Sequence, residues 1–264
     1  MPKVKANTMD IYYEIHGTGP PLLMILGLGA NITWWGKYFI KGLADHFKVI
    51  VFDNRGTGQS SNPKSQYSVR TLADDANSLL KALNIEKTFV FGHSMGGGIA
   101  QELIIQYSGI SKLILCNSSC GGSKSILASP EVLQIVNKTR SGRTPIEIAQ
   151  ESLKIFYSPD FIKDHPKLID YAVQNMAKSQ MLPKNYEWQG RAIKSFKTCD
   201  RLKNIIIPTL IMHGAKDVLV PPQNAKILAD LIPNAHIKMF AESAHAPYVE
   251  EPDAVIEAIV EFLL

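Results

Sequence analysis

The fold of this chain is decided by one short stretch, Gly92-His93-Ser94-Met95-Gly96. It follows an apolar run at 88–91 and precedes a glycine-rich segment with helical character. This order predicts a strand, a sharp turn and a helix, with Ser94 at the apex in a strained backbone conformation. Glycines flank the serine because side chains there would collide as the chain doubles back. The positive end of the following helix would point at Ser94, where it could stabilise a developing negative charge.

The length and composition are those of a globular α/β domain with room for an insertion. The chain has 264 residues, 45% of them apolar, which is enough to bury a full core. Its formal net charge of +4 is small and is spread along the chain. Because no dense Lys/Arg block and no basic stripe interleaved with aromatic residues occurs, we expect no nucleic-acid partner.

The cysteines and the N-terminal region indicate the compartment. The chain has three cysteines, Cys116, Cys120 and Cys199. Their number is odd, and their spacing is not that of metal ligands. We interpret them as reduced thiols in a cytoplasmic protein, without a metal site. The N-terminal residues show no signal peptide, and the longest apolar run near them, 22–28, is too short to span a bilayer. We therefore expect no membrane insertion.

Short apolar runs alternate with helical patterns along most of the chain. One helix is expected over 69–83 with Ser68 as its N-cap, and others after Ser94, after Pro221-Pro222 and after Pro252. Strands that alternate with helices imply a mainly parallel sheet with helices on both faces. The expected strands are residues 3–6, 10–16, 22–26, 48–52, 88–91, 112–116, 208–213 and 236–240.

The middle of the chain has a different sequence pattern. Residues from about 119 to 197 show helical periodicity and no strong strand pattern. Proline and glycine residues interrupt the periodicity at Pro130, Gly142, Pro145, Pro159, Pro166 and Pro183. The pattern of strand followed by helix resumes only at Pro208. We therefore interpret this stretch as a helical insertion in the α/β domain.

A serine hydroxyl needs a base to become a nucleophile, and the base needs a carboxylate that orients it. In a parallel sheet such groups collect at the carboxyl ends of strands, in the order serine, acid, histidine. His245, in the loop after the last strand, fits the base, and Asp217, just past the preceding strand, fits the acid. Glu242 is the competing acid because it is close to His245 in sequence. Asp217 is favoured because a neighbouring strand end can reach the imidazole Nδ1.

The other histidines have weaker arguments. His93 lies within the elbow stretch and is expected to point away from the side of the serine. His213 closes a strand and is expected to be packed and hydrogen-bonded. No placement argument supports the rest, which are His16, His46, His165 and His236.

An oxyanion would require two backbone N–H donors. One is expected from Met95, the residue after the serine, and the other from Leu28, in the turn after the strand at 22–26. Gly27 and Gly29 would let the backbone approach the substrate. The alternative is that these two glycines only end the strand.

The chain resembles the α/β-hydrolase family over nearly its whole length. The resemblance implies an eight-stranded sheet with a helical lid inserted after the sixth strand. The core domain would then comprise 1–118 and 198–264, and the lid 119–197. The motifs that match the family's order are the elbow at 92–96, the Asp53-Asn54-Arg55-Gly56-Thr57-Gly58-Gln59-Ser60 segment, the His213-Gly214-x-x-Asp217 motif and the late His245.

The resemblance is greatest to the carboxylesterase, enol-lactonase and carbon–carbon bond hydrolase branch. In that family the segment at 53–60 braces turns near the site, so Arg55 receives no catalytic role. Many relatives have His-Gly before the oxyanion residue, whereas this chain has Leu26-Gly27, which leaves the support of that loop open. A serine nucleophile argues against the haloalkane dehalogenase and epoxide hydrolase branches, which use aspartate.

The first functional hypothesis is therefore a cofactor-independent serine carboxylesterase acting on small to medium esters. Enol-lactone or carbon–carbon bond hydrolysis by the same residues is the alternative, followed by a ligand-binding receptor on a hydrolase scaffold and a peroxidase-like side activity. The oligomeric state is left open, a homodimer being one option. Most of the large residues of the expected lid should pack it onto the core and a few should line an apolar pocket; they are Phe156, Tyr157, Phe161, Tyr171, Met176, Met181, Tyr186 and Trp188, together with Trp34 and Trp35.

Overall fold

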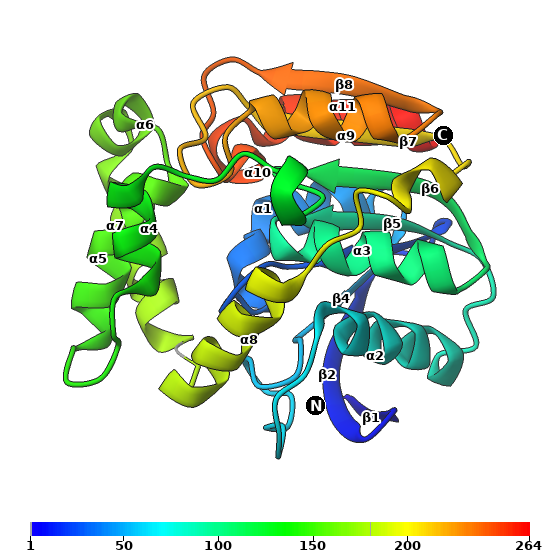
Figure 1. Ribbon diagram of the computed structural model, residues 1–264, viewed down its shortest axis with the longest axis horizontal. Coiled ribbons are helices and arrows are strands. Elements are labelled where there is room, and N and C mark those ends of the chain that lie inside the picture. The colour runs from blue at the N-terminus through cyan, green and yellow to red at the C-terminus, as the bar shows by residue number, and fades with distance from the viewer. Residues whose placement is uncertain (1, 180) are drawn as a thin grey trace.

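The computed structural model describes residues 2–179 and 181–264, so the expected ranges 1–118 and 119–197 each contain one residue outside it, Met1 and Gln180. The described chain folds around one eight-stranded sheet, in the order β1-β2-β4-β3-β5-β6-β7-β8 (Figure 1). The strands are β1 (Lys3–Ala6), β2 (Met9–His16), β3 (Pro21–Ile25), β4 (Lys48–Phe52), β5 (Thr88–His93), β6 (Ile110–Cys116), β7 (Thr209–Gly214) and β8 (Ala235–Phe240). All eight expected strands are present, with ends that differ by no more than two residues.

The sheet is parallel from β4 to β8, and only β1 and β2 run antiparallel to their neighbours. The chain adds β4 on one side of β3 and then crosses to add β5 on the other side. The carboxyl ends of β3 and β5 are therefore adjacent where the strand order reverses, with Ile25 opposite Gly92. Ligands of open α/β sheets bind at such a reversal.

Alternate residues of the central strands enter two separate cores, one on each face of the sheet. Leu22 and Met24 of β3 pack in the first core, and Leu23 and Ile25 pack in the second. This period of two follows from the alternating direction of side chains along a strand. The first core is covered by α1 (Lys37–Ala44) and α11 (Pro252–Leu263), and the second by α2 (Val69–Ala82), α3 (Met95–Gln106) and α9 (Gln223–Leu231).

The segment at 53–60 is a brace rather than a reactive site. Arg55 donates to both oxygens of Asp75 in α2, at 2.6 Å each, and both side chains are buried. Asp53 accepts from the backbone N–H groups of Ile32 and Gln59 at 2.9 and 2.7 Å. These bonds hold the loops at the carboxyl ends of β3 and β4, which agrees with the supporting role expected for this segment.

Between β6 and β7 the described residues form helices and no strand. The helices are α4 (Pro130–Asn137), α5 (Pro145–Phe156), α6 (Pro159–Asp164), α7 (Pro166–Lys178) and α8 (Pro183–Ser195). Each begins at a proline, which suits the first turn because the missing N–H would have no partner there. In Figure 1, α4 to α7 lie together at the end toward which the arrows of β6 and β8 point. The insertion expected at 119–197 therefore consists of helices beside the carboxyl ends of the strands.

The expectation of three reduced thiols was wrong for two of them. Cys120 and Cys199 form a disulfide, and only Cys116 is a free, buried thiol. The pair joins the two ends of the helical insertion, where Gly121 and Lys197 also form an antiparallel bridge. Because 79 residues separate the two cysteines, nothing local in the sequence indicated the pairing.

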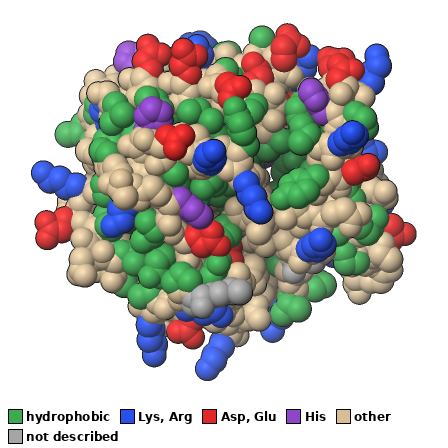
Figure 2. Space-filling view, turned by 180° about the vertical axis from the view of Figure 1, so that it is seen from behind, with side chains coloured by type: hydrophobic (Ala, Val, Ile, Leu, Met, Phe, Trp, Pro, Cys, Tyr) green, Lys and Arg blue, Asp and Glu red, His purple; other side chains and the backbone are tan. Residues whose placement is uncertain are grey.

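The surface gives two further observations. On the face drawn in Figure 2, acidic and basic side chains are interspersed with apolar ones. None of the helices in the described ranges combines the length and the apolar character that crossing a membrane requires.

Candidate active site

Ser94 occupies the strained turn that its motif predicted. It lies between β5 and α3 with φ 57° and ψ −124°, a region that residues with side chains rarely adopt. Its N–H donates to the carbonyl oxygen of Cys116 at 2.9 Å, which anchors the turn to β6. A Cβ on Gly92 would lie 2.5 Å from the carbonyl oxygen of Gly96, so this close approach requires glycine. The elbow therefore presents Ser94 at the carboxyl end of the sheet.

His245 and Asp217 are in direct contact. Asp217 follows β7, His245 follows β8, and Nδ1 of His245 lies 2.8 Å from Oδ2 of Asp217. Both side chains are almost completely buried. The competing acid, Glu242, has a side chain that is 73% exposed and bonds Lys216 instead, at 2.7 Å. The carboxylate that orients His245 is therefore that of Asp217.

Asp217 is held by donors on both oxygens. Oδ1 accepts from the N–H groups of Leu219 and Val220 at 2.8 and 2.9 Å, and Oδ2 also accepts from Nδ2 of Asn117 at 2.6 Å. Burial by itself raises the pKa of Asp217, but the imidazoles of His245 and His213 outweigh burial and hold the pKa well below its usual range. Asp217 is thus a fixed, ionised acceptor.

The second nitrogen of His245 is left available. Nε2 is buried and bonds no atom among the described residues, and His245 lines the same cavity as Ser94. Because Asp217 accepts a hydrogen bond from the Nδ1–H group, the free lone pair of the neutral imidazole is on Nε2. His245 is therefore set to accept a proton on the side of the cavity.

The two residues expected to supply oxyanion donors lie on neighbouring segments, Leu28 in the loop after β3 and Met95 at the start of α3. Within the described ranges, the N–H groups of Leu28 and Met95 have no protein acceptor, and both residues line the cavity. Gly27 abuts the serine, because a Cβ there would lie 2.8 Å from Cβ of Ser94. Gly29, with φ 72°, supplies the turn. Two N–H groups without a protein acceptor among the described residues therefore belong to residues that line the same cavity as Ser94.

Side chains from other parts of the chain support this loop. Nδ2 of Asn54 donates to the carbonyl oxygen of Leu26 at 3.1 Å, and the N–H of Gly29 donates to Oε1 of Gln189 at 2.9 Å. Asn54 belongs to the segment at 53–60, and Gln189 lies on α8 of the helical insertion. These two bonds support the loop at Leu26-Gly27, where many relatives have His-Gly. The sequence alone left the support of this loop open. The sequence analysis expected support from the segment at 53–60, which includes Asn54, but it did not identify Gln189.

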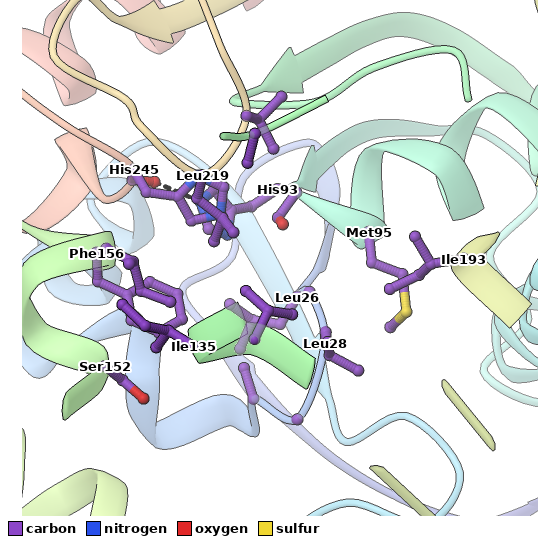
Figure 3. Close-up of a pocket in the computed structure, with 18 of the residues that line it drawn as sticks. Leu26, Leu28, His93, Met95, Ile135, Ser152, Phe156, Ile193, Leu219 and His245 are labelled. Atoms are coloured by element: carbon purple, nitrogen blue, oxygen red, sulfur yellow. Dashed lines mark hydrogen bonds between the residues drawn. The ribbon is translucent and has the colours of Figure 1, made fainter. Parts of the chain in front are cut away.

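His93 contacts the backbone of His245. Figure 3 shows the two histidines side by side, and Nε2 of His93 lies 2.7 Å from the carbonyl oxygen of His245. The His93 ring also packs against those of Trp35 and Tyr248. Burial lowers the pKa of His93 to about 3, and repulsion from His245 contributes to the shift. His93 is therefore neutral, with the proton on Nε2. His213 is packed as expected, with Nε2 bonded to the carbonyl oxygen of Val220 at 2.8 Å.

The loop that carries His245 is also tied to the insertion. The N–H of His245 donates to the carbonyl oxygen of Phe156 at 3.1 Å. Glu250 accepts from the N–H of Ala244 and from that of Ser158, at 2.8 Å each. Burial raises the pKa of Glu250. The position of His245 therefore depends on contacts with both ends of the short segment from Phe156 to Ser158.

Ser94 and His245 open into one cavity of about 250 Å³ between the sheet and the insertion. Figure 3 shows Phe156 and Ile135 near His245, with Leu28 and Met95 across the cavity. Of the large residues expected in a lid, only three line it, namely Phe156, Met176 and Tyr186; Trp34 joins them from the core. Others are buried elsewhere, and Tyr171 is 56% exposed. The aliphatic lining from Ile126, Leu127, Leu133, Ile135, Ile148 and Ile193 was not expected from the sequence.

Comparisons with known proteins identify the family of the fold. Residues 20–252 match the model of the alpha/beta hydrolase fold family. Among solved structures, a thermophilic esterase from Thermogutta terrifontis is similar at 27% identity and a TM-score of 0.86, covering 100% of this chain and 98% of that one. The enol-lactonase from Burkholderia xenovorans LB400 is similar at 25% identity and a TM-score of 0.88, covering 99% of both chains.

A curated relative adds a third activity to these two. A putative carbamate hydrolase, RutD of Azorhizobium caulinodans, is 27% identical over 263 residues, which span 99% of this chain and 98% of that protein. These proteins share the fold but differ in the bond that their names say they cleave. The family match, which covers most of the chain, establishes that this protein belongs to the α/β-hydrolase fold family.

Proposed function

We propose that the protein is a serine hydrolase that cleaves small to medium carboxylic esters through an acyl-enzyme, without a cofactor. One observation carries the proposal: the 2.8 Å bond between Asp217 and Nδ1 of His245, which leaves Nε2 without a bonded partner in a residue that lines the cavity of Ser94. An oriented base beside an elbow serine is the arrangement that acyl transfer requires. In this proposal Ser94, His245 and Asp217 form the catalytic triad.

The reaction would proceed in two halves. Oγ of Ser94 attacks the ester carbonyl carbon while Nε2 of His245 takes the hydroxyl proton. The negative oxygen of the tetrahedral intermediate is bound by the N–H groups of Leu28 and Met95. The intermediate collapses, the alcohol leaves with the proton from His245, and the acyl group remains on Ser94. Water then enters by the same steps and releases the acid.

The ionised carboxylate of Asp217 has an electrostatic role in this scheme. It holds the imidazole in the tautomer with the proton on Nδ1, and it stabilises the imidazolium that forms in each half of the reaction. Because the pKa of Asp217 lies below its usual range, the carboxylate stays charged across the neutral pH range.

The helical insertion at 119–197 is proposed to act as a lid and the rest of the chain as the core domain. The support is its position over the carboxyl ends of the strands and its contribution of Phe156 and Met176 to the cavity wall. A cavity of about 250 Å³ suits a substrate smaller than the ligands of typical drug-sized pockets. We therefore expect short to medium acyl chains.

Enol-lactone hydrolysis is the second candidate function. The similarity to the Burkholderia xenovorans enol-lactonase over 99% of both chains favours it, and the same residues would open a lactone ring. A lactone keeps its alcohol attached to the acyl group, so no separate alcohol leaves. Product analysis therefore separates the two reactions.

Two measurements test the proposal. A fluorophosphonate should give one covalent adduct, which mass spectrometry should locate on Ser94. A panel of p-nitrophenyl esters and lactones, assayed at equal concentrations, should then give turnover of the esters. If an adduct forms on Ser94 but only lactones are opened, the reaction is that of the second candidate. If no adduct forms, the nucleophile is misassigned.

We propose a cytoplasmic localisation, which the redox state of Cys120 and Cys199 can test. Disulfides such as that between Cys120 and Cys199 persist in oxidising compartments and are rare in the cytoplasm. In a cytoplasmic protein these two cysteines would therefore be reduced, in contrast to the disulfide that the structure contains. Alkylation of thiols at the moment of cell lysis should then label three cysteines per chain, whereas labelling of Cys116 alone would contradict the cytoplasmic proposal.

A further inference from the structure

One end of the cavity carries an excess of positive charge. The charged side chains that line it are Lys138, Arg140, Arg143 and Glu151, all from the helical insertion. Glu151 is fully engaged, because Oε1 lies 2.7 Å from Nζ of Lys138 and Oε2 lies 2.6 Å from the guanidinium of Arg143. Within the described ranges, Arg140 forms no ion pair. This end of the cavity therefore has one carboxylate for three cations.

Arg140 is positioned by an aromatic ring. Its guanidinium carbon lies 3.5 Å from the centre of the Tyr186 ring, the stacked arrangement that arginine favours. The ring is itself held, since the Tyr186 hydroxyl donates to the carbonyl oxygen of Val136 at 3.2 Å. Stacking uses the flat face of the guanidinium and leaves the N–H groups at its edge free to bind an anion.

The same ring links Arg140 to the oxyanion loop. A Cβ on Gly29 would lie 3.2 Å from both Cδ2 and Cε2 of Tyr186, so the ring covers this glycine. Arg140 therefore lies one aromatic ring away from the loop that holds the Leu28 N–H. Arg140 and Ser94 also line the same cavity, so a substrate whose reacting carbonyl is at Ser94 can extend toward the unpaired cation.

We propose that Arg140 is a specificity residue, which binds a carboxylate on the part of the substrate remote from the scissile bond. The preferred substrates would be half-esters of dicarboxylic acids, or lactones that carry a carboxylate, rather than neutral esters. The inference rests on the proposed function for its reaction, but the anion site itself does not. Carboxylates match the planar donor pattern of a guanidinium, and the apolar remainder of the cavity accepts the connecting methylenes.

The test compares charged and neutral substrates of equal length. Monomethyl succinate, glutarate and adipate are assayed beside the neutral monoamides of the same half-esters by titration of released acid. The wild-type enzyme should favour one of the half-esters by about 10- to 100-fold in kcat/KM, because its carboxylate gains a charge-assisted hydrogen bond. Arg140→Gln should remove this preference mainly through KM and leave the neutral substrates within a fewfold. Arg140→Lys should keep part of it.

A matched control is available on the same insertion. Arg191 is also an arginine of the insertion, but it pairs with Glu187 on an exposed helix face and does not line the cavity. Arg191→Gln should leave both substrate series unchanged. If Arg140→Gln slows the charged and neutral series equally, Arg140 only supports Tyr186 and the proposal is overturned. Equal rates for both series in the wild-type enzyme would also overturn it.

A binding measurement separates this inference from the proposed reaction. Titration calorimetry with valerate and with its neutral amide, valeramide, requires no turnover. Valerate should bind the wild-type protein at least tenfold more tightly than valeramide, and Arg140→Gln should abolish the difference. If no ester is cleaved but this difference is found, the anion site stands and the reaction class is wrong. If esters are cleaved but valerate and valeramide bind alike, the reaction stands and the anion site is wrong.

Discussion

His93 donates a hydrogen bond from Nε2 to the carbonyl oxygen of His245, over 2.7 Å. The residue that precedes the elbow serine on β5 therefore fixes the backbone of the histidine that follows β8. Two segments that are 152 residues apart in sequence are joined by this one bond. His93, which is next to Ser94 in the motif, is thus bonded to the backbone of His245, another member of the proposed triad.

Loss of this bond should lower both stability and turnover. His93→Phe keeps an aromatic ring but leaves the buried carbonyl of His245 without its donor, which should cost about 1–3 kcal/mol in the free energy of unfolding. A shift of the imidazole by a fraction of an ångström should lower kcat by roughly ten- to a hundredfold. His93→Gln, whose amide can donate from a similar position, should recover much of both losses. Urea unfolding and ester kinetics measure the two effects, and equal kcat for both variants would exclude a positioning role.

His93 should also make stability depend on pH. Its pKa in the folded protein is lowered to about 3, whereas the unfolded chain protonates near the ordinary value of 6.5. The unfolded state therefore binds more protons between these values, so the contribution to stability is complete above about pH 6.5 and is lost as the pH falls. The slope approaches about 1.4 kcal/mol per pH unit in this window.

Comparison of variants isolates this contribution. Urea unfolding at pH 4.5, 5.5 and 7 should show a smaller pH dependence for His93→Gln than for the wild-type protein. His236→Gln, at an exposed position of β8, serves as the control and should keep the wild-type dependence. A pH dependence that His93→Gln leaves intact would assign the effect to other groups.

Ser94→Ala should abolish ester turnover while leaving the fold intact. Removal of the nucleophile of a serine triad costs on the order of a millionfold in kcat. The Ser94 side chain makes no hydrogen bond with the described residues, so thermal unfolding should change little. Residual activity above about a thousandth of the wild-type value would show that another residue attacks the substrate.

The choice between Asp217 and Glu242 can be tested by a pair of amide variants. Asp217→Asn can present an N–H group at the position where the carboxylate accepted a hydrogen bond from His245. It therefore favours the wrong tautomer of His245 and should lower kcat by roughly 10⁴-fold. Glu242→Gln changes only an exposed ion pair with Lys216 and should leave kcat within twofold. If Glu242→Gln causes the larger loss, the acid is misassigned.

The parts of the site that the sequence predicted share one property. Ser94 lies in a turn whose glycines are adjacent in sequence, and Asp217 and His245 each follow a strand directly. Their placement therefore required only local patterns and the rule that parallel strands present their carboxyl ends together. The strands were predictable from local patterns too, because β3 to β7 each contain a short apolar run, whereas the outer strands β1, β2 and β8 alternate apolar and polar residues.

The supporting residues have no comparable local signal. Asn117 bonds Asp217 across 100 residues, and Gln189 bonds the N–H of Gly29 across 160. An amide on a loop or helix is ordinary in sequence, and its partner becomes visible only in three dimensions. Asn117 alone could have been noticed, because it directly follows β6 and so lies at the same edge of the sheet. The Cys120–Cys199 disulfide was missed for the same reason of distance in sequence.

The insertion should set the acyl-chain preference through the residues that line the cavity. Each acyl methylene that stays inside gains about 0.8 kcal/mol of burial, so kcat/KM should rise with chain length until the cavity is full and then fall. Met176 lines the cavity and is buried, and its truncation in Met176→Ala enlarges the space. The optimum should therefore move to a longer chain, while turnover of acetate esters stays within a fewfold.

Tyr171 supplies the matched control for this last prediction. It lies on the same helix as Met176, α7, but its side chain is 56% exposed and does not line the cavity. Tyr171→Ala should leave the chain-length profile unchanged, as measured with p-nitrophenyl esters from acetate to decanoate. Phe156→Ala is a less clean probe, because the Phe156 ring also packs against His245 and its loss should slow all chain lengths. If Met176→Ala and Tyr171→Ala give the same profile as the wild-type enzyme, this helix does not limit the acyl pocket, and the optimum is set by residues of the core.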